Sequence, residues 1–566
     1  MKRSVAELYL EYLASSGIDF IFANAGTDFA PIIEAYVARG RSGAVVPRPI
    51  IASHENVAVS MAIGNWMVTG KMQACMVHVN VGTANAICGL LNAARGSVPM
   101  LFTAGRTPVT ESGQLGSRNL GVHWTQEMFD QAGMVREAVK WEYELRNSAQ
   151  LGDVVQRAVS VGNAYPKGPV YLTLPREVLA SEVQSDQLKP SRQAIRSVPP
   201  SISPETANAV VDLIARSEFP ILITSQLGYD RKAGSLLPSF VEATGIAVIE
   251  ASPSCVSLSA DHSFHAGYDP HALLPEADLI LVIDCPVPWI PQRAQPAVDA
   301  KIVHIGVDPL FSVLPMRSFQ CDLALCSTAG EALDQLNAAL GTARLSEGKI
   351  ARRKSRIDEH NDARRKKAME VLERVKHLKP IHPVWASHCI GQLLNEETVL
   401  LRESPQLSTA VLNLRHAGGS FSGHFAGGLG WGLGAAIGVK LADPSRTVIT
   451  VEGDGSYIFS TPVAAHHSAL ENDAPFLTVI MDNHGWNEVH AATTHVYPDG
   501  HAARGNRAEP LTYFSPKLLL EKTIETVGGV GFRVSDPEEL PEQLAQAIDV
   551  VRSGRQAVLT IVCSST

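Results

Sequence analysis

The sequence predicts an α/β protein built from three domains, each a doubly wound parallel sheet. Short runs of β-branched and other apolar residues end on glycine, proline or polar residues, and they alternate with longer helical segments. That alternation is typical of parallel strands joined by crossover helices. A chain of 566 residues is also too long for one hydrophobic core. We expect domains at residues 1–187, 188–345 and 379–566, with a linker helix at 346–378.

The composition is that of a globular protein whose main partners are neither nucleic acids nor membranes. Apolar residues make up 45% of the chain and charged residues 19%, and the net charge of −9 is not accompanied by a basic stripe. Each long apolar run is broken by glycine, proline or a charge, and the N-terminus does not read as a secretory signal. The eight cysteines form no CxxC pair, which favours free thiols in a reducing compartment. We therefore expect a cytoplasmic protein.

In the first domain we expect five strands, at residues 19–22, 48–52, 73–80, 98–103 and 169–174. Glu55 follows the second of these, where the strand gives way to a helix. A carboxylate there can simply be stabilised by the positive end of the helix dipole, or it can belong to a ligand site at the carboxyl edge of the sheet. The local sequence leaves both interpretations open. His78 is expected on the third strand, as a core histidine with its hydrogen bonds satisfied.

The middle domain follows a proline-rich segment that runs from Leu188 to Pro204. Strands are expected at residues 220–224, 247–249, 279–284 and 301–305. No GxGxxG motif occurs here, so we expect a mainly structural role, with Trp289 and the Cys285-Pro286 turn as a candidate pocket wall. The charged segment after residue 345 contains acids among its basic residues, so it predicts a solvated linker helix rather than a nucleic-acid patch.

In the last domain, a β-branched strand at residues 446–451 leads into Gly453-Asp454-Gly455-Ser456, and a second strand at 476–481 leads into Asp482-Asn483. Both turns should therefore lie at the carboxyl edge of one parallel sheet, the usual ligand crevice. The Asp454 carboxylate, the Asn483 amide and the backbone carbonyl at Gly485 are oxygen ligands that suit Mg²⁺. They would leave coordination sites for diphosphate oxygens, so this stretch predicts a diphosphate–Mg²⁺ clamp. The alternative is an unrelated α/β turn.

Gly-Asp-Gly followed at this distance by Asn resembles the thiamine-diphosphate motif of acetolactate synthases, pyruvate decarboxylases and benzoylformate decarboxylases. Two departures occur: Asp482-Asn483 replaces the usual Asn-Asn, and Asn483 lies 29 residues after Asp454, slightly more than the commonest spacing. The resemblance implies a pyrimidine-binding, a middle and a diphosphate-binding domain, as in acetolactate synthase-like enzymes. It implies thiamine diphosphate and Mg²⁺ as cofactors. FAD occurs in some relatives, but no motif indicates it here.

The resemblance also implies the site residues. Glu55, within Ser53-His-Glu-Asn56, matches the glutamate that donates to N1′ of the aminopyrimidine and so activates the cofactor. The stretch from Gly82 to Asn85 matches the segment after it, although Asn80-Val81 stands where the family has Gly-Pro. His123 and Gln126 match a loop that protonates and positions substrate; a solvated loop histidine is the alternative. In the glycine-dense loop the Gly427 carbonyl would accept from the 4′-amino group and Leu429 would prop the cofactor. The rest of the expected cofactor contacts are Gly453, Gly455, Ser456, Asn483, Gly485 and Trp486.

These implications predict decarboxylation of a 2-oxo acid, with transfer of the remaining fragment to a second carbonyl acceptor. Because Glu55 and Asp454 lie in different domains, the resemblance implies a dimer or tetramer with each site across a subunit interface. Three related activities share every cofactor motif: simple 2-oxo acid decarboxylation, 2-hydroxyacyl-CoA cleavage and an oxalyl-CoA decarboxylase-like reaction. A non-catalytic relative that only binds nucleotide is the alternative from another class, and the survival of Glu55, Asp454 and Asn483 argues against it.

Overall fold

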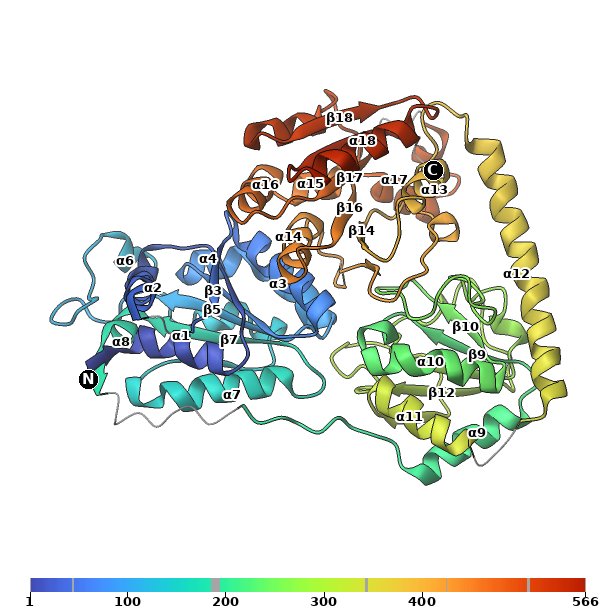
Figure 1. The fold of residues 1–566 in the computed structure, drawn as a ribbon, viewed down its shortest axis with the longest axis horizontal. Coiled ribbons are helices and arrows are strands. Elements are labelled where there is room, and N and C mark those ends of the chain that lie inside the picture. The colour runs from blue at the N-terminus through green and yellow to red at the C-terminus, as the bar shows by residue number, and fades with distance from the viewer. Residues whose placement is uncertain are drawn as a thin grey trace.

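The computed structural model describes residues 2–42, 45–184, 194–341, 345–423, 425–505 and 509–564. Three separate parallel sheets are present, each covered by helices, so the predicted α/β class with three parallel-sheet domains is confirmed (Figure 1). The first boundary that we predict, between residues 187 and 188, lies outside the described residues. The exact domain limits stay predictions. None of the described helices combines the length and apolar character needed to span a bilayer.

The first sheet has the strand order β3-β2-β4-β5-β7-β6, and each neighbouring pair is parallel. Its strands are β2 (Phe20–Ala23), β3 (Arg48–Ile51), β4 (Gln73–Val77), β5 (Met100–Arg106), β6 (Glu142–Glu144) and β7 (Pro169–Pro175). Its helices are α1 (Val5–Ser15), α2 (Ala30–Ser42), α3 (Glu55–Thr69), α4 (Val79–Asn85), α5 (Ile87–Arg95), α6 (Val122–Thr125), α7 (Leu151–Asn163) and α8 (Arg176–Ala180). A short antiparallel pair, β1 (Lys2–Ser4) with β8 (Glu182–Gln184), joins the two ends of this domain. Strand β6 has no counterpart among the predicted strands.

The third predicted strand, residues 73–80, is too long. Strand β4 ends at Val77, and helix α4 begins two residues later. The backbone turns at Val79, whose φ of 32° is a left-handed conformation that interrupts an extended strand. His78 therefore caps α4 at the carboxyl edge of the sheet and is not a core residue of a strand.

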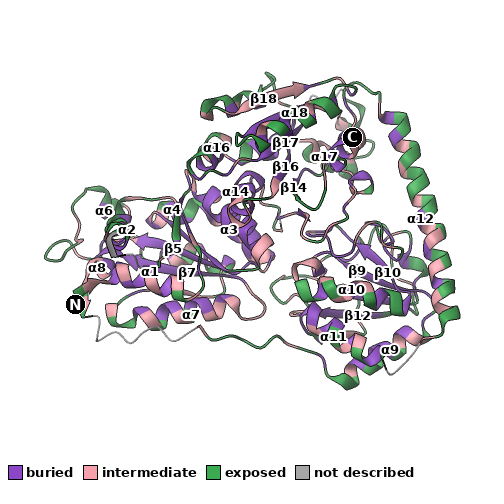
Figure 2. Ribbon diagram, in the orientation of Figure 1, coloured by how far each residue is buried: buried purple, intermediate pink, exposed green. Residues whose placement is uncertain are grey.

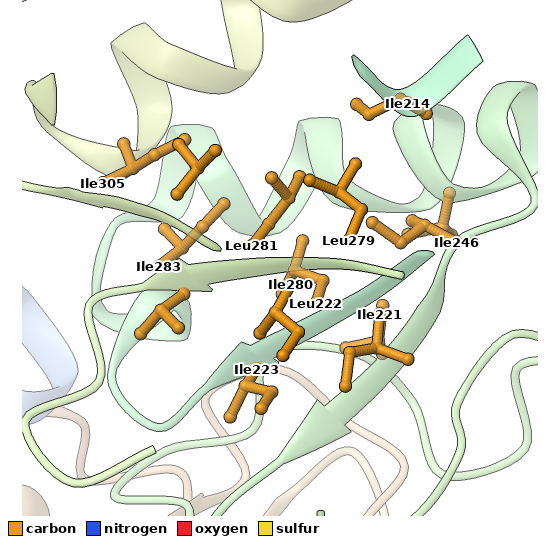
Figure 3. Packing of buried hydrophobic residues seen from close by; sticks show 14 of the residues in the cluster. Ile214, Ile221, Leu222, Ile223, Ile246, Leu279, Ile280, Leu281, Ile283 and Ile305 are labelled. Atoms are coloured by element: carbon orange, nitrogen blue, oxygen red, sulfur yellow. The ribbon is translucent and has the colours of Figure 1, made fainter. Parts of the chain in front are cut away.

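The middle sheet has the order β10-β9-β11-β12-β13 and is also parallel throughout. Its elements are α9 (Pro204–Arg216), β9 (Pro220–Thr224), α10 (Arg231–Thr244), β10 (Ala247–Glu250), β11 (Leu279–Ile283), β12 (Lys301–Gly306), β13 (Leu323–Cys326) and α11 (Ala329–Leu340). Figure 3 shows aliphatic side chains of β9 and β11, such as Ile221 and Leu281, packed in its core. Helices cover both faces, so these strands are apolar on both sides instead of alternating.

The last sheet has the order β15-β14-β16-β17-β19-β18. Its strands are β14 (Thr398–Glu403), β15 (Ser420–Phe421), β16 (Thr447–Gly453), β17 (Leu477–Asp482), β18 (Val530–Val534) and β19 (Ala557–Val562). Its helices are α13 (Pro383–Gly391), α14 (Gly432–Ala442), α15 (Asp454–Phe459), α16 (Pro462–Glu471), α17 (Asn487–Val496) and α18 (Leu540–Arg552). The two strands predicted around the Gly-Asp-Gly motif are β16 and β17, which pair directly in parallel.

Helix α12 (Glu347–Val375) connects the middle sheet to the last one along an edge of the molecule (Figure 1). Most of its surface is exposed, as the linker-helix prediction requires (Figure 2). It nevertheless docks on the middle domain, because the buried Arg353 guanidinium donates to the carbonyls of Ile214 at 2.6 Å and Ser217 at 2.5 Å.

The first and last domains meet through helices α3 and α14, which lie against each other (Figure 1). A Cβ on Gly64 would come within 2.1 Å of the Ala435 carbonyl oxygen, and one on Gly438 within 1.9 Å of the Met61 carbonyl oxygen. The two backbones can approach so closely only because glycine has no side chain. This contact fixes the orientation of Glu55, at the start of α3, relative to the glycine-dense loop that precedes α14.

Candidate active site

Asp454 lies at the junction of β16 and α15, where the sequence predicts the metal clamp. Its side chain is 2% exposed, and its two oxygens accept the backbone N–H of Gly455 at 2.9 Å and of Gly485 at 3.0 Å. Burial, and after it the negative charge of Asp482, raises the pKa of Asp454 to about 7. A carboxylate in this position gains from a nearby cation. The donor set of Asp454, Asn483 and the Gly485 carbonyl therefore fits a hard divalent cation such as Mg²⁺.

Asp482 occupies the position next to Asn483, and its charge is already compensated by protein groups. One oxygen pairs with the His484 ring at 2.9 Å, and the other with Arg533 at 3.0 Å. Arg533 also bonds Glu521 at 3.1 Å, so it ties this turn to β18 and the segment before it. Asp482 thus anchors the turn, and Asn483, the next residue, is half-buried.

Trp486 packs directly on the Gly-Asp-Gly turn. A Cβ on Gly455 would lie 2.3 Å from the Trp486 ring, so only glycine permits this contact. The same ring makes a tilted contact with Phe459 and an edge-to-face contact with Phe514, with ring centroids 5.5 and 4.9 Å away. The polar run after Trp486 begins with helix α17. Gly453 caps the N-terminus of α15 directly before Asp454, and Ser456 lies in the first turn of the same helix.

The loop that carries Gly427 and Leu429 is held from two sides. From the first domain, Asn92 of α5 donates to the Gly428 carbonyl at 2.8 Å and accepts the Gly428 N–H at 3.2 Å. From below, the Glu403 carboxylate accepts the N–H groups of Gly430 and Gly432. Gly427 is exposed and has a φ of 75°, which suits glycine. The loop is therefore rigid where its backbone would face a ligand.

Glu55 begins helix α3 and is 8% exposed. The Asn85 amide donates to its carboxylate at 3.1 Å, and Gly82 leaves the space beside it: a Cβ there would lie 3.3 Å from Oε1. The three first-domain residues predicted to bind the cofactor are thus one cluster at the carboxyl edge of the first sheet. A buried carboxylate that receives a single side-chain hydrogen bond keeps acceptor sites free for a ligand.

His123 and Gln126 lie at the same sheet edge, but in different surroundings. His123 is 2% exposed, and its Nδ1 accepts the Asn119 N–H at 3.2 Å. Burial and the charge of Arg176 lower the pKa of His123. The Gln126 amide instead contacts the ring of His78, with 3.3 Å between the two Nε2 atoms. The catalytic roles of His123 and Gln126 stay predictions.

Sequence reasoning missed four residues that build this site: Asp28, His78, Asn92 and Glu403. The sequence pattern places His78 inside a predicted strand and Asp28 beyond the end of another, and it gives no signal that distinguishes Asn92 or Glu403 from structural residues. A signal was available for Asp28, since it follows the strand predicted at residues 19–22 and the carboxyl edge of a parallel sheet is where ligands bind. None was available for His78, which the pattern places inside a strand.

The predicted residues fall into two groups within one chain. Among the described residues, no hydrogen bond or ion pair joins Glu55 or Asn85 to Asp454, Asn483 or Gly485. The two groups are instead connected through the Asn92 and glycine-loop contacts.

Each group lies in a segment that matches a known family. Residues 3–134 match the model described as thiamine pyrophosphate enzyme, N-terminal TPP binding domain, and residues 406–561 match its C-terminal TPP binding domain. The chain belongs to the thiamine pyrophosphate enzyme family. Thiamine pyrophosphate is the same compound as thiamine diphosphate. The two matched segments contain every residue predicted above to bind the cofactor or metal or to act in catalysis, whereas the candidate pocket wall at Trp289 and Cys285-Pro286 lies between them.

Two relatives of this thiamine pyrophosphate enzyme span most of its length. The acetolactate synthase large subunit of Haemophilus influenzae is 25% identical over 575 residues, covering 97% of this chain and 93% of that protein. The benzoylformate decarboxylase of Pseudomonas aeruginosa is 26% identical over 500 residues, covering 85% of this chain and 86% of that protein. In structure, the chain superposes on the thiamine diphosphate-dependent 4-hydroxybenzoylformate decarboxylase of Rhodococcus jostii with a TM-score of 0.81 at 20% identity over the full length of both chains. That likeness establishes the fold.

A cavity of about 320 Å³ lies between the first and middle domains of this thiamine pyrophosphate enzyme, at the carboxyl edge of the middle sheet. Asp284 faces it with a φ of 45°, and burial raises the pKa of that carboxyl to about 7. An acid at this edge does not favour the diphosphate of FAD, and the described lining contains no glycine-rich loop of N–H donors. The described lining of this cavity therefore does not indicate an FAD-binding site.

Proposed function

We propose that this protein is a thiamine-diphosphate- and Mg²⁺-dependent enzyme that decarboxylates a 2-oxo acid and joins the remaining fragment to a second carbonyl. The observation that carries the proposal is the pair of buried acids, Glu55 at one sheet edge and Asp454 at another, each at the position that the cofactor motif assigns to it. When bound, thiamine diphosphate supplies the electron sink that makes loss of CO₂ from a 2-oxo acid feasible.

The roles of the chain's own residues follow from their surroundings. Asp454, Asn483 and the Gly485 carbonyl would hold Mg²⁺, and the backbone around Gly453, Gly455 and Ser456 would face the diphosphate. Trp486 closes the turn from outside. The Gly427 carbonyl and Leu429 would contact the pyrimidine side of the cofactor. Their loop is held in place by hydrogen bonds from Asn92 on one side and Glu403 on the other. Glu55 would hold the proton at N1′ through its carboxyl group.

Simple decarboxylation to an aldehyde is a second candidate, and one observation favours it. The His78 ring, half-buried and paired with Asp28 at 2.6 Å, places a protonatable nitrogen at the first sheet edge close to Glu55. An enzyme that releases an aldehyde must protonate the reacting carbon, whereas carboligation bonds that carbon to the acceptor instead.

Substrates bound to coenzyme A lack comparable support. The arginines near the first sheet edge are already engaged: Arg106 and Arg118 donate to Glu127, and Arg176 donates to the carbonyls of Gly116 and Ser117. Arginines whose donors are engaged in this way do not form a free phosphate-binding cluster.

We also propose self-association, with each site shared between two subunits. Glu55 and Asp454 lie in different domains, and among the described residues no hydrogen bond or ion pair joins them; a cofactor that contacts both could therefore draw them from two chains. Large apolar side chains are exposed near both groups, among them Trp124 and Phe129 on one side and Tyr497 and Leu511 on the other. Exposed apolar surface of this kind marks association sites.

The decisive test is a substrate panel. The purified protein, with thiamine diphosphate and Mg²⁺, is incubated with a series of 2-oxo acids with and without aldehyde or 2-oxo acid acceptors, and the products are identified by NMR. We expect CO₂ release from at least one acid, and a hydroxyketone or 2-hydroxy-2-oxo acid product when an acceptor is present. Aldehyde alone under every condition would establish the second candidate. Failure to bind the cofactor in calorimetry would reject both.

A further inference from the structure

Strand β3, which leads into the candidate active site, is an edge strand of the first sheet. On one side it pairs with β2, and just beyond its end the Ala52 N–H still donates to the Ala23 carbonyl at 2.9 Å. The Ala52 carbonyl accepts the Asn24 amide at 2.9 Å on the same side. An edge strand leaves the backbone groups of its other side in need of partners. Because extended backbone alternates in direction, these groups belong to Ile51 and Ser53, the neighbours of Ala52.

The last domain supplies these partners through helix α16 and the residue that caps its C-terminus. The Ser53 N–H donates to the Ser468 hydroxyl at 2.9 Å. The Asn472 amide donates to the Ile51 carbonyl at 2.9 Å. The Ser53 hydroxyl lies 2.7 Å from Nδ1 of His467. Three side chains of one segment therefore hold the backbone where β3 ends.

Further hydrogen bonds fix the directions of Ser468 and Asn472. The Ser468 hydroxyl donates to the Ala464 carbonyl at 2.7 Å, so its oxygen presents a lone pair to the Ser53 N–H. The Asn472 amide nitrogen carries two hydrogens, and the one not used by Ile51 goes to the Ser468 carbonyl at 2.7 Å. Both side chains are buried, with exposed fractions of 0% and 6%. Because a buried polar group is costly without its partner, these contacts resist displacement.

His467 makes its contact from an exposed position on the same helix. Its ring Nε2 lies 3.7 Å from Glu471, one turn further along α16, and about half of its side chain is accessible. Its Nδ1 can bond the Ser53 hydroxyl in either protonation state, since a hydroxyl both donates and accepts. Replacement of this exposed ring does not open the core, so His467 is the residue at which the contact is tested without loss of the fold.

The held segment leads directly to Glu55, since only His54 separates Ser53 from it. His54 caps α3, and its Nδ1 accepts the Asn56 N–H at 3.1 Å, which fixes the backbone between strand and helix. The Asn56 amide in turn donates to the Gly430 carbonyl, at 3.4 Å, in the glycine-dense loop. The start of α3 thus lies between two contacts with the last domain, one before Glu55 and one after it.

We propose that Ser468, Asn472 and His467 are positioning residues for Glu55, and that the last domain orients this carboxylate toward the cofactor through them. The proposal rests on the proposed function, in which Glu55 holds the N1′ proton, and it names the residues that direct that group. They act through the backbone that precedes Glu55 and not on the cofactor itself. A displacement of about 1 Å at a reacting group can cost about 10²-fold in rate, so a small relaxation of this segment is enough to slow cofactor activation.

The first experiment measures the held segment directly and does not require the cofactor. Amide hydrogen exchange of peptides that cover residues 51–58 is followed by mass spectrometry in wild type, Ser468→Ala and His467→Ala. We expect faster exchange in both variants, most of all in Ser468→Ala, because that change removes the acceptor of the Ser53 N–H. Leu470→Ala, at an exposed position of the same helix, is the control and should exchange like wild type. Unchanged exchange in both variants would overturn the proposal.

The second experiment tests whether the contact serves Glu55. Exchange of the C2 proton of bound thiamine diphosphate with deuterium is measured by acid quench and NMR, and cofactor affinity is measured by calorimetry. His467→Ala should slow C2 exchange by about 10- to 10²-fold, whereas affinity in the presence of Mg²⁺ should change little, because the proposed metal clamp lies elsewhere. His467→Asn should restore most of the rate, since its amide takes the place of Nδ1. Ser468→Thr, which keeps the hydroxyl, is the corresponding rescue of Ser468→Ala.

A double variant separates positioning from general destabilisation. In Glu55→Gln the carboxylate is already lost, so the addition of His467→Ala should slow C2 exchange no further. An undiminished additional effect would show that His467 acts on something other than Glu55. Wild-type C2 exchange in both His467→Ala and Ser468→Ala, with normal cofactor binding, would reject the positioning role and leave the proposed function intact. A wild type that binds no cofactor would instead reject the proposed function, and the positioning role with it.

Discussion

The carboxylate of Asp454 accepts the backbone N–H of Gly485 at 3.0 Å and thereby joins the ends of β16 and β17. One hydrogen bond connects the two halves of a motif that are far apart in the sequence. It holds the carboxylate, the Asn483 amide and the Gly485 carbonyl at one sheet edge. In the metal clamp that we propose, this carboxylate would have both a structural and a ligand role.

Asp454→Ala should abolish retention of thiamine diphosphate, because the diphosphate loses the cation that bridges it to the protein. The measurement is calorimetric titration of cofactor in the presence and absence of Mg²⁺. Asp549→Ala on α18, an exposed acid of the same domain, is the control and should bind normally. Wild-type affinity in Asp454→Ala would show that the clamp assignment is wrong.

Metal-free protein should become less stable as the pH rises through about 7. Burial and Asp482 raise the pKa of Asp454 to about 7, so the folded state holds this proton more tightly than the unfolded chain. The resulting stability is complete below the unfolded pKa and is lost as the pH rises through the folded one. Asp454→Asn cannot ionise there, so its free energy of unfolding relative to wild type should increase between pH 5 and pH 8. Urea unfolding with a chelator measures this difference. Addition of Mg²⁺ should stabilise only the wild type, and an equal pH response in both proteins would contradict the argument.

Glu55→Gln should fold and bind cofactor, since the amide keeps the size of the side chain and can still accept from Asn85. It cannot hold the N1′ proton in the same way, so exchange of the cofactor's C2 proton should slow together with turnover, by about 10²- to 10⁴-fold. Deuterium exchange followed by acid quench and NMR is the readout. Glu34→Gln, on the exposed face of α2, is the control. Exchange of the C2 proton at the wild-type rate in Glu55→Gln would show that Glu55 does not activate the cofactor.

Mixing two inactive variants should restore activity if sites are shared. In a mixed dimer, one of the two sites is intact: it combines the unmutated Glu55 of the Asp454→Ala chain with the unmutated Asp454 of the Glu55→Gln chain. The other site carries both substitutions. Random re-association should then recover about a quarter of the wild-type sites in a two-fold dimer. The measurement is turnover after the mixed chains are dissociated and re-associated, with each variant alone as the blank. No recovery in verified mixed dimers would place each site within one chain.

Gly438→Ala should destabilise the contact between α3 and α14, because the new methyl group would lie 1.9 Å from the Met61 carbonyl oxygen. We expect a loss of about 1–3 kcal/mol in the free energy of unfolding, typical of overpacking. Gly40→Ala on α2 is the matched control: no atom lies within 4 Å of its added Cβ, so a small gain in helix stability is expected there. Chemical denaturation of both variants provides the comparison, and equal effects would contradict the close contact of the two helices.

The sequence by itself determined the α/β class and the motif around Asp454, because both depend on local patterns. Apolar runs of strand length that end on glycine or on polar residues mark β16 and β17 without any knowledge of the fold. The functional motif combines residue types at a fixed spacing, which the sequence also shows. The same patterns placed Glu55 at the end of a strand. They described His78 wrongly, since a strand pattern cannot show that the backbone at Val79 turns early.

Only the tertiary structure decided which distant residues support these groups. Asp28 is hydrogen-bonded to His78, Asn92 is hydrogen-bonded to Gly428, and Asp482 forms an ion pair with Arg533. In each case the two residues are far apart in the sequence. These contacts form because parallel strands deliver their carboxyl ends to one edge and because α3 packs on α14. A single sequence carries no record of such pairings, since hydrogen bonds between remote segments depend on the complete three-dimensional packing and not on local propensity.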